Sequence, residues 1–467
     1  MKMKVYNSLT HNVEDLVPLA DNTIRLYTCG PTVYNFAHIG NFRAYMFEDI
    51  LRRTIQFNSM KIRQVMNLTD VDDKTIRGAN AAGVELTQYT KTYKDAFFAD
   101  LKKLNIQSAE VYPAATDHIP EMIDLVSKLI EKGVAYKSDD GSVYFSVTKF
   151  PQYGQLAHID FDNQRTGARC ASDEYDKENV GDFALWKAWE ESDGPVAWDS
   201  PWGKGRPGWH IECSAMAMKY LGETFDLHTG GIDNLFPHHE NEIAQAQAAT
   251  GKQFVKTWMH CAHLRVNGEK MSKSLGNFFT LRDLLEKGYT GREIRYVLVN
   301  AHYRQGLNFA FTALEDARKS LERIDTCVDQ LEAKSSGATP DAQVPEFAVK
   351  ALEDFTAAVN DDLNTPKAFA AVFELVRASN AAIATLSPSE AGAIINVFRR
   401  MDEVLGVIFF EKKEKEEVPE EILAILNERA AARAAKNWAE SDRLRDELAA
   451  KGWIVKDSRD GQSVTKK

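Results

Sequence analysis

Two short segments of this chain carry residue types that could bind and transfer phosphate groups. Residues 31–41 are rich in small side chains and bring His38 and Gly40 to the start of a predicted helix, and residues 270–274 read Lys-Met-Ser-Lys-Ser. A histidine at a helix N-terminus can neutralise a triphosphate, and a mobile loop with two lysines can close over it as charge develops. Together the segments predict activation of a substrate by a nucleotide.

A second group of residues has the chemistry of a metal site. His238 and Glu242 are four residues apart, which places them on one face of a helix that Pro237 could start. Cys29 ends a predicted strand beside the first segment, and Cys213 lies far downstream. Two thiolates, an imidazole and a carboxylate suit Zn²⁺. The spacing leaves other ligands open, namely His210, His239, His260, Cys261 and His263.

The elements that must position these residues follow an α/β pattern. Residues 24–29 alternate in polarity and predict a strand, residues 44–57 have helical spacing of apolar side chains, and residues 61–68 predict a second strand. A strand, a helix and a strand form a βαβ unit, whose ligands lie at the carboxyl ends of the strands. Cys29 and residues 69–74 fall at those ends.

Composition limits the class of protein. The chain has 467 residues, too many for one core, and its 44% hydrophobic and 27% charged residues are ordinary for a globular protein. The sequence contains no apolar stretch of the about 18 residues that a membrane span needs, and its N-terminus lacks the apolar core of a signal peptide. Five scattered cysteines favour reduced thiols or metal ligands. We expect a cytoplasmic protein.

The net charge of −11 argues at first against nucleic acid as a partner, because phosphate binding usually needs a basic domain. The charge is an average over the whole chain, however, and an acidic protein can still carry a basic stripe.

The pattern along the chain changes several times. Residues 111–205 are irregular, with a hairpin expected at Asp139, Asp140 and Gly141, and residues 222–242 and 258–274 return to strands and loops. Residues 334–345 and 411–417 have the composition of linkers. The expected parts are the first half of the catalytic domain (1–110), a connective insertion (111–205), the second half (206–293), a helical domain (294–410) and a C-terminal unit (418–467) in which two helices span 419–451.

Longer motifs resemble the cysteinyl-tRNA synthetase family of class I aminoacyl-tRNA synthetases. The matching segments are 29–34, 67–74, 208–216, 236–242, 361–368 and 436–448. The resemblance implies a class I Rossmann-like nucleotide-binding domain split by an insertion, followed by a helical bundle and a small C-terminal anticodon-binding unit. Residues 38–41 read His-Ile-Gly-Asn instead of the commoner His-Ile-Gly-His, and Asn41 fits the variant of this family.

The resemblance also implies roles for single residues. The ligands of one zinc ion would be Cys29, Cys213, His238 and Glu242. The cysteine pocket would be lined by Gly30, Thr69, Trp209, His228 and Asp233, although Trp209 could instead pack in the core and Asp233 could cap a turn. The catalytic residues would be His38, Asn41, Lys270 and Lys273, with Gly40 and Lys273 binding ATP together with Mg²⁺.

The implied reaction joins L-cysteine to tRNA(Cys). Cysteine would react with ATP to form cysteinyl-adenylate, and the cysteinyl group would pass to the 3′-terminal ribose of the tRNA. A zinc ion held by two thiolates would prefer the substrate thiolate over a hydroxyl. The C-terminal unit would grip the anticodon end of the tRNA, although its helices could instead form a solvated hairpin that only covers apolar surface. Its helices carry the basic residues Arg429, Arg433, Lys436, Arg443 and Arg445.

Two other functions remain possible on the sequence alone. A tRNA-independent ligase that joins activated cysteine to an amino-sugar would share the catalytic half but lack the C-terminal region. A zinc-bearing RNA-binding protein without activity would have lost the ATP motifs, yet residues 270–274 are intact.

Overall fold

The structure is a computed structural model that describes residues 2–159, 181–272, 275–336, 343–411, 418–458 and 461–466. The chain forms two compact units, a main unit (Met1–Glu411) and a C-terminal unit (Lys412–Lys467). Each unit has a hydrophobic core of its own.

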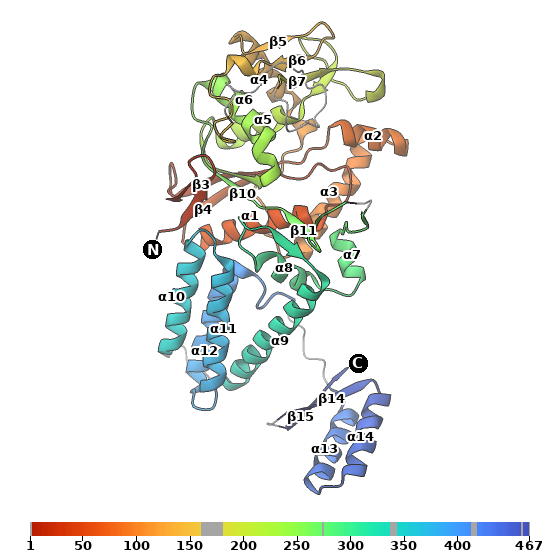
Figure 1. Ribbon diagram of the computed structural model, residues 1–467. Helices are drawn as coiled ribbons and strands as arrows, with labels where there is room; N and C mark the ends of the chain where they lie inside the picture. The colour runs from red at the N-terminus through yellow and green to blue at the C-terminus, as the bar shows by residue number, and fades with distance from the viewer. Residues whose placement is uncertain are drawn as a thin grey trace. The chain divides into compact units, whose positions relative to one another are not determined.

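A four-stranded parallel sheet with the order β10-β9-β3-β4 forms the centre of the main unit (Figure 1). Its strands are β3 (Thr23–Thr28), β4 (Lys61–Met66), β9 (Phe225–Gly231) and β10 (Val255–Cys261). The sheet is covered on both faces, because Leu26 packs into one core and its neighbour Tyr27 into the other. The predicted α/β fold, with two halves of one domain flanking an insertion, is confirmed.

The helix α1 (Ile39–Phe57) lies between this sheet and the helices α8 (Gly291–Val299) and α12 (Pro388–Leu405). It begins five residues earlier than its apolar spacing predicts. The reason is a capping box, in which His38 Nδ1 accepts from the Asn41 backbone N–H at 3.2 Å and Asn41 Oδ1 accepts from the His38 N–H at 3.1 Å.

The insertion contains an antiparallel sheet with the order β5-β6-β7-β8, packed against α4 (Ile119–Glu131) and α5 (Trp209–Leu221). Its strands are β5 (Ala135–Lys137), β6 (Val143–Phe145), β7 (Phe183–Ala188) and β8 (Gly205–Pro207). The predicted hairpin is confirmed, since Lys137 pairs with Val143 on either side of a turn in which Gly141 has φ +92°. Residues 160–180 lie outside the described residues.

The remaining elements complete the main unit. A helical bundle is made by α9 (Phe311–Lys334), α10 (Glu346–Asn360), α11 (Thr365–Ala382) and α12, as the periodicity beyond residue 294 predicts. The other helices and strands are β1 (Lys4–Asn7), β2 (Asn12–Asp15), α2 (Asp73–Ala82), α3 (Leu86–Lys103), α6 (Glu240–Thr250), β11 (Leu264–Val266), β12 (Glu269–Lys270), α7 (Leu281–Glu286) and β13 (Leu307–Phe309).

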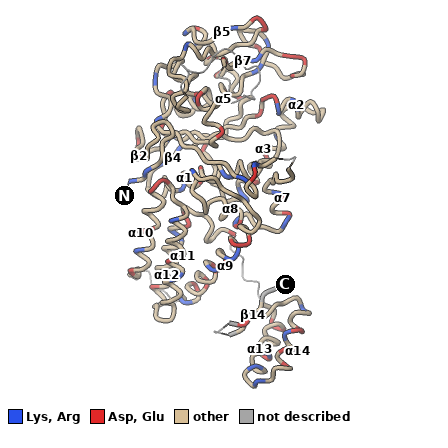
Figure 2. Tube along the Cα trace, in the orientation of Figure 1, with Lys and Arg blue, Asp and Glu red and all other residues tan. Residues whose placement is uncertain are grey.

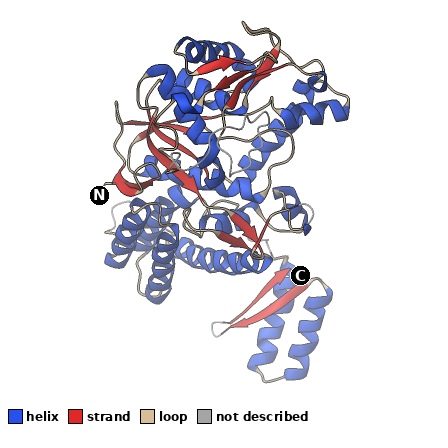
Figure 3. Cartoon of the chain, turned by 45° about the horizontal axis from the view of Figure 1, so that its top comes forward, coloured by secondary structure: helices blue, strands red, loops and turns tan. Residues whose placement is uncertain are grey.

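The C-terminal unit consists of a helix pair and a hairpin (Figure 3). The helices α13 (Glu420–Ala434) and α14 (Trp438–Ala450) confirm the predicted pair. The antiparallel strands β14 (Trp453–Ser458) and β15 (Gly461–Lys466) were not expected as a hairpin. Leu444, Leu448 and Trp453 join apolar side chains of α13 in the core of this unit.

Candidate active site and metal centre

Four side chains from different parts of the main unit meet at the carboxyl end of the central sheet. Cys29 follows β3, Cys213 lies in α5, His238 lies in a helical turn before α6, and Glu242 lies in the first turn of α6. One ligand atom from each lies within 4.8 Å of the others. All four are buried, with Glu242 fully so. The structure therefore brings together the ligand set that the sequence resemblance implies.

The turn that carries His238 differs from a simple helix start at Pro237. A π-helical turn spans Leu235–His239, and Phe236 inside it has an extended backbone (φ −139°, ψ 133°). Helical geometry then continues through His239 into α6. His238 and Glu242 therefore lie one helical turn apart, and their side chains approach to 3.1 Å between Nε2 and Oε1.

The carboxylate of Glu242 shows how the cluster fits a cation. Its Oε2 lies 2.9 Å from His228 Nε2 and forms a hydrogen bond. Its Oε1 is buried and lies 3.1 Å from His238 Nε2, so this oxygen and this nitrogen point into the same cluster. A buried carboxylate is costly unless positive charge lies close to it. A metal ion would use that oxygen as a ligand.

The electrostatics of the two thiols agree with a cation site. Burial raises the pKa of Cys213, but a hydrogen bond with Cys29 and the neighbouring His238 bring it down to about 6. The same hydrogen bond, burial and the charge of Cys213 raise the pKa of Cys29 well above its usual value. Two thiols and a carboxylate this close cannot all ionise without added positive charge, which a divalent cation supplies.

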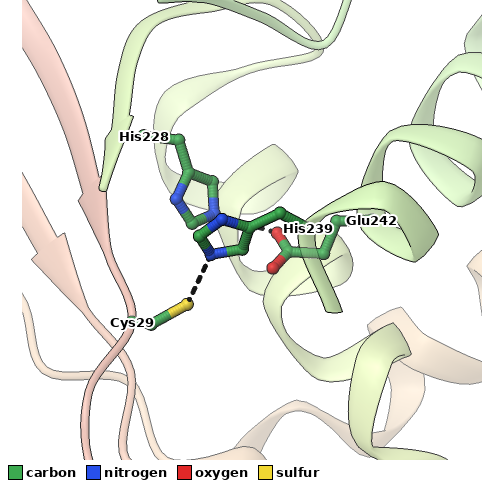
Figure 4. A group of neighbouring side chains, drawn as sticks. All are labelled: Cys29, His228, His239 and Glu242. Atoms are coloured by element: carbon green, nitrogen blue, oxygen red, sulfur yellow. Dashed lines mark hydrogen bonds and ion pairs between the residues drawn. The ribbon is translucent and has the colours of Figure 1, made fainter. Parts of the chain in front are cut away.

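A second group overlaps the first and contains Cys29, His228, His239 and Glu242 (Figure 4). In the picture His239 lies between Cys29 and the other two side chains, with Nε2 at 3.2 Å from Cys29 Sγ. Its Nδ1 pairs with His260 Nε2 at 2.8 Å. Burial and four neighbouring histidines hold the pKa of His239 well below its usual value, so this ring is neutral.

The remaining alternative ligands, His210, Cys261 and His263, lie outside both groups. His210 Nδ1 lies 2.8 Å from His238 Nδ1, so His210 supports a member of the first group. Cys261 is buried and its thiol donates to the Arg43 carbonyl at 3.7 Å, as expected for a small buried residue. His263 is exposed.

The residues expected around the substrate cysteine lie on several sides of this cluster. The Gly30 N–H donates to Asn67 Oδ1 at 2.8 Å, and the Thr69 hydroxyl donates to Glu212 Oε2 at 2.8 Å. The ring of Trp209 is half-buried and stacks on His238, with centroids 4.3 Å apart. Trp209 is thus part of the site wall and is not buried in the core.

The two other pocket residues differ in burial. His228 is fully buried in β9 and forms a hydrogen bond with Glu242, so it supports a member of the candidate metal group. Asp233 is exposed in a short turn after β9. Burial lowers the pKa of His38, and the charge of Asp233 acts in the opposite direction, which places Asp233 near His38.

The two segments that we expect to bind phosphate meet at the start of α1. The Ile39 N–H donates to the Phe279 carbonyl at 3.0 Å, so the loop after β12 lies against the helix N-terminus. A Cβ at Gly40 would lie 2.6 Å from Met271 Cε and 2.9 Å from the His38 ring, so a larger residue there would displace these two side chains. Lys270 is exposed at the end of β12. Lys273 lies outside the described residues.

Sequence reasoning gave no role to two residues that support the site. Glu212 is fully buried beneath Thr69, and Asn67 holds both Gly30 and the Thr69 hydroxyl. Each stands inside a motif that resembles the family. The spacing of Trp209, Glu212 and Cys213 on one face of a helix could have indicated Glu212.

Comparisons with known proteins cover nearly the whole chain. Residues 15–319 match the family described as "tRNA synthetases class I (C) catalytic domain". Residues 354–410 match the "DALR domain", and residues 415–464 match the "Cysteinyl-tRNA ligase anticodon binding domain". A relative from Protochlamydia amoebophila named cysteine–tRNA ligase is 52% identical over 469 residues, which cover 99% of this chain and 98% of the relative. The chain belongs to the cysteinyl-tRNA synthetase family.

Further relatives support the same membership. The cysteine–tRNA ligase of Chlamydia muridarum is 46% identical, and the alignment covers all of both chains. Among solved structures, the methionyl-tRNA synthetase of Mycobacterium tuberculosis in complex with methionyl-adenylate has a TM-score of 0.62. It is 14% identical, and the match covers 82% of this chain and 92% of the other. Within the cysteinyl-tRNA synthetase family, the fold is therefore that of class I synthetases.

The C-terminal arginines of this cysteinyl-tRNA synthetase correct one prediction. Arg429 is fully buried and forms a double hydrogen bond with Asp457 at 2.8 and 3.0 Å, so it is a structural residue and cannot contact RNA. Arg433 and Arg445 also approach Asp457, and Arg443 pairs with Glu440 and Glu447 on the surface of α14. Both signs of charge appear along these helices (Figure 2). Lys436 is exposed.

Among the described residues, no helix combines the length and the apolar character that crossing a membrane requires.

Proposed function

We propose that this protein activates L-cysteine with ATP and transfers the cysteinyl group to the 3′-terminal ribose of tRNA(Cys). The observation that carries the proposal is the buried cluster of Cys29, Cys213, His238 and Glu242, which lies at the sheet edge where His38 begins α1. Thiol ligands beside a phosphate-binding helix suit a substrate that has both a thiol and a carboxylate. We place the reaction in the cytoplasm.

Zinc is the metal that this ligand set fits. Two thiols, one imidazole and one carboxylate are the ligands of a four-coordinate zinc site, and the group that lacks Cys213 has only one thiol. Bound zinc would supply a soft Lewis acid that takes a thiolate far better than a hydroxyl. Without the metal, the apolar walls of a pocket would distinguish the side chain of cysteine from that of serine by only about 1–3 kcal/mol.

The protein side chains hold the amino acid in place. Trp209 covers the imidazole of His238, and Thr69 and Gly30 form a polar wall that Asn67 and Glu212 keep in position. We assign His228 to the orientation of Glu242, because its Nε2 holds one carboxylate oxygen. We assign Asp233 to the open side of the pocket, where its carboxylate could take the substrate ammonium.

Activation requires stabilisation of charge on the phosphates. The cysteine carboxylate attacks the α-phosphate and pyrophosphate leaves with Mg²⁺. His38 and the N-terminus of α1 face the triphosphate, while Gly40 lets the nucleotide approach the backbone. Lys270 and Lys273 then close on the leaving pyrophosphate. We assign Asn41 to holding His38, because each residue caps the other.

Transfer to tRNA is the second step of the proposal. The match at residues 415–464 to an anticodon-binding domain supports a tRNA acceptor over an amino-sugar. The exposed Lys436 and the partly exposed Arg433 are candidates for contact with the RNA.

The test is an assay of both half-reactions. Cysteine-dependent exchange between ATP and pyrophosphate should occur without tRNA, and serine should not replace cysteine. Transfer of cysteine should then require tRNA(Cys). Exchange with serine at a comparable rate would contradict the role of the thiol cluster, and transfer to a small amine without tRNA would contradict the acceptor.

A further inference from the structure

A cleft of about 460 Å³ lies next to this site, and the proposed reaction uses none of the residues that line it. It opens between the loop that precedes α1 and the helices α2 and α3. Six of its lining residues decide its chemistry, namely Tyr34, Tyr89, Tyr93, Lys74, Arg77 and Ala81. Among the described residues that line it, none is acidic.

The aromatic wall of the cleft is held in a fixed arrangement. The Tyr89 hydroxyl donates to the Tyr34 carbonyl at 2.9 Å, and the rings of Tyr89 and Tyr93 pack edge to face with centroids 5.2 Å apart. A Cβ at Gly78 would lie 2.3 Å from the Tyr89 hydroxyl, so a glycine is required for this packing. Lys74 Nζ stands 5.6 Å from the centre of the Tyr34 ring.

The cleft adjoins the reaction site through the backbone. The Val33 N–H donates to the Thr69 carbonyl at 3.0 Å, and Tyr34 is the next residue. His38 follows four residues later, while Lys74 is five residues beyond Thr69. The two loops that frame the cysteine pocket therefore continue directly into the walls of the cleft.

A surface that combines aromatic faces with cations and lacks acidic groups suits a nucleotide, because bases stack on the rings and phosphates pair with the cations. ATP is assigned elsewhere, where His38 and Met271 meet at Gly40. We propose that the cleft binds one nucleotide of the unpaired 3′ end of tRNA, with its base on the tyrosines and its phosphate near Lys74 and Arg77. This inference rests on the proposed function and adds a subsite to it.

The first test fills the cleft without removing a contact. Ala81→Phe places a ring in the cleft, and Ala82→Phe adds the same ring at an exposed neighbour outside it. Ala81→Phe should raise the KM for tRNA about tenfold, the effect of losing one stacked base. Cysteine-dependent pyrophosphate exchange should stay at the wild-type rate, which also shows that the variant is folded. Ala82→Phe should change neither rate.

The second test removes one charge. Arg77→Gln keeps the length of an exposed side chain that lines the cleft, and Lys102→Gln makes the same charge change on α3 outside it. If Arg77 contacts a phosphate of the single strand, the slope of log affinity for tRNA against log salt should fall by about 0.7. The Lys102→Gln slope should match that of the wild type.

A free nucleotide offers the same chemistry, so cytidine and adenosine 5′-monophosphate are titrated against the wild type and Ala81→Phe. Suppose that the free nucleotide binds to the wild type but not to Ala81→Phe, while Ala81→Phe and Arg77→Gln both transfer cysteine to tRNA normally. That result would assign the cleft to a free nucleotide and overturn the tRNA assignment. Wild-type KM and salt slope in Ala81→Phe and Arg77→Gln would also overturn it. If the wild type exchanges pyrophosphate but transfers nothing to tRNA, the proposed acceptor is wrong and the subsite falls with it.

Discussion

His210 Nδ1 lies 2.8 Å from Nδ1 of His238 in the interior of the main unit. One proton is shared between the two nitrogens, which leaves Nε2 of His238 directed at Glu242 and the thiols. His210 is fully enclosed and the charge of His238 adds to burial in lowering its pKa, so His210 is the neutral partner. The pair therefore sets the orientation of the His238 ring, a candidate metal ligand.

Replacement of His210 should weaken zinc binding without removing a ligand. We expect His210→Ala to reduce zinc affinity about 10–100-fold, the usual effect of losing a residue that orients a ligand. Chelator competition measures this change. His210→Asn should lose less zinc affinity than His210→Ala, because the asparagine amide can still form a hydrogen bond with His238. Equal affinity in all three proteins would contradict the orienting role.

Removal of a thiol should lower zinc content and activation together. Cys213→Ser takes one soft ligand from the cluster, and we expect cysteine-dependent exchange to fall at least about tenfold. Elemental analysis and the exchange assay check the two effects. Cys327→Ser is the matched control, since this buried thiol lies in α9 away from the cluster. Full zinc and activity in Cys213→Ser would refute the ligand assignment.

Lys273 should act mainly in the transition state of activation. We expect Lys273→Ala to bind cysteine normally but to lose roughly 2–4 kcal/mol in adenylate formation, typical of one stabilising group. Pre-steady-state exchange kinetics separate the two effects. A raised KM for ATP with an unchanged turnover number would show instead that this lysine binds ATP in the ground state.

Removal of the C-terminal unit should separate the two half-reactions. The main unit has its own cores, so a chain ending at Glu411 should fold and exchange pyrophosphate at the normal rate. Aminoacylation should fall steeply through weaker tRNA binding and recover in part at low salt. Unchanged aminoacylation by this shorter chain would show that the unit is dispensable for the acceptor.

The ion pair between the buried Arg429 and the exposed Asp457 should contribute to the stability of the C-terminal unit. Arg429→Ala removes the charged hydrogen bonds to Asp457 and should cost about 1.5–3 kcal/mol. Arg443→Ala, which removes an exposed arginine, should cost less than about 1 kcal/mol. Thermal unfolding of the isolated unit compares them. Similar losses in both variants would contradict the structural role of Arg429.

The same pair predicts a dependence on pH. The hydrogen bond from Arg429 holds the pKa of Asp457 below its usual value. A carboxyl whose folded pKa is depressed contributes stability above its unfolded pKa of about 4 and loses it as the pH falls through the folded value. The C-terminal unit should therefore lose stability below about pH 4, and Asp457→Asn should remove this part of the pH dependence.

Local patterns in the sequence determined the elements and the chemistry they carry. The alternation at residues 24–29, the turn at Gly141 and the small residues before His38 each depend on near neighbours, which is why the strand, the hairpin and the helix start could be read from the chain. The motifs with Cys29 and Cys213 also pointed to a metal. Spacing alone did not choose among the histidines.

Tertiary structure decided which of those residues meet. Cys29 and the turn with His238 come together because β3 and β9 pair in parallel across the insertion, and such long-range pairing leaves no mark on local periodicity. Packing also placed His210 behind His238 and buried Arg429 against Asp457, although charge alone suggested contact with RNA. A side chain's partners depend on the surface that folds against it, and that surface comes from distant parts of the chain.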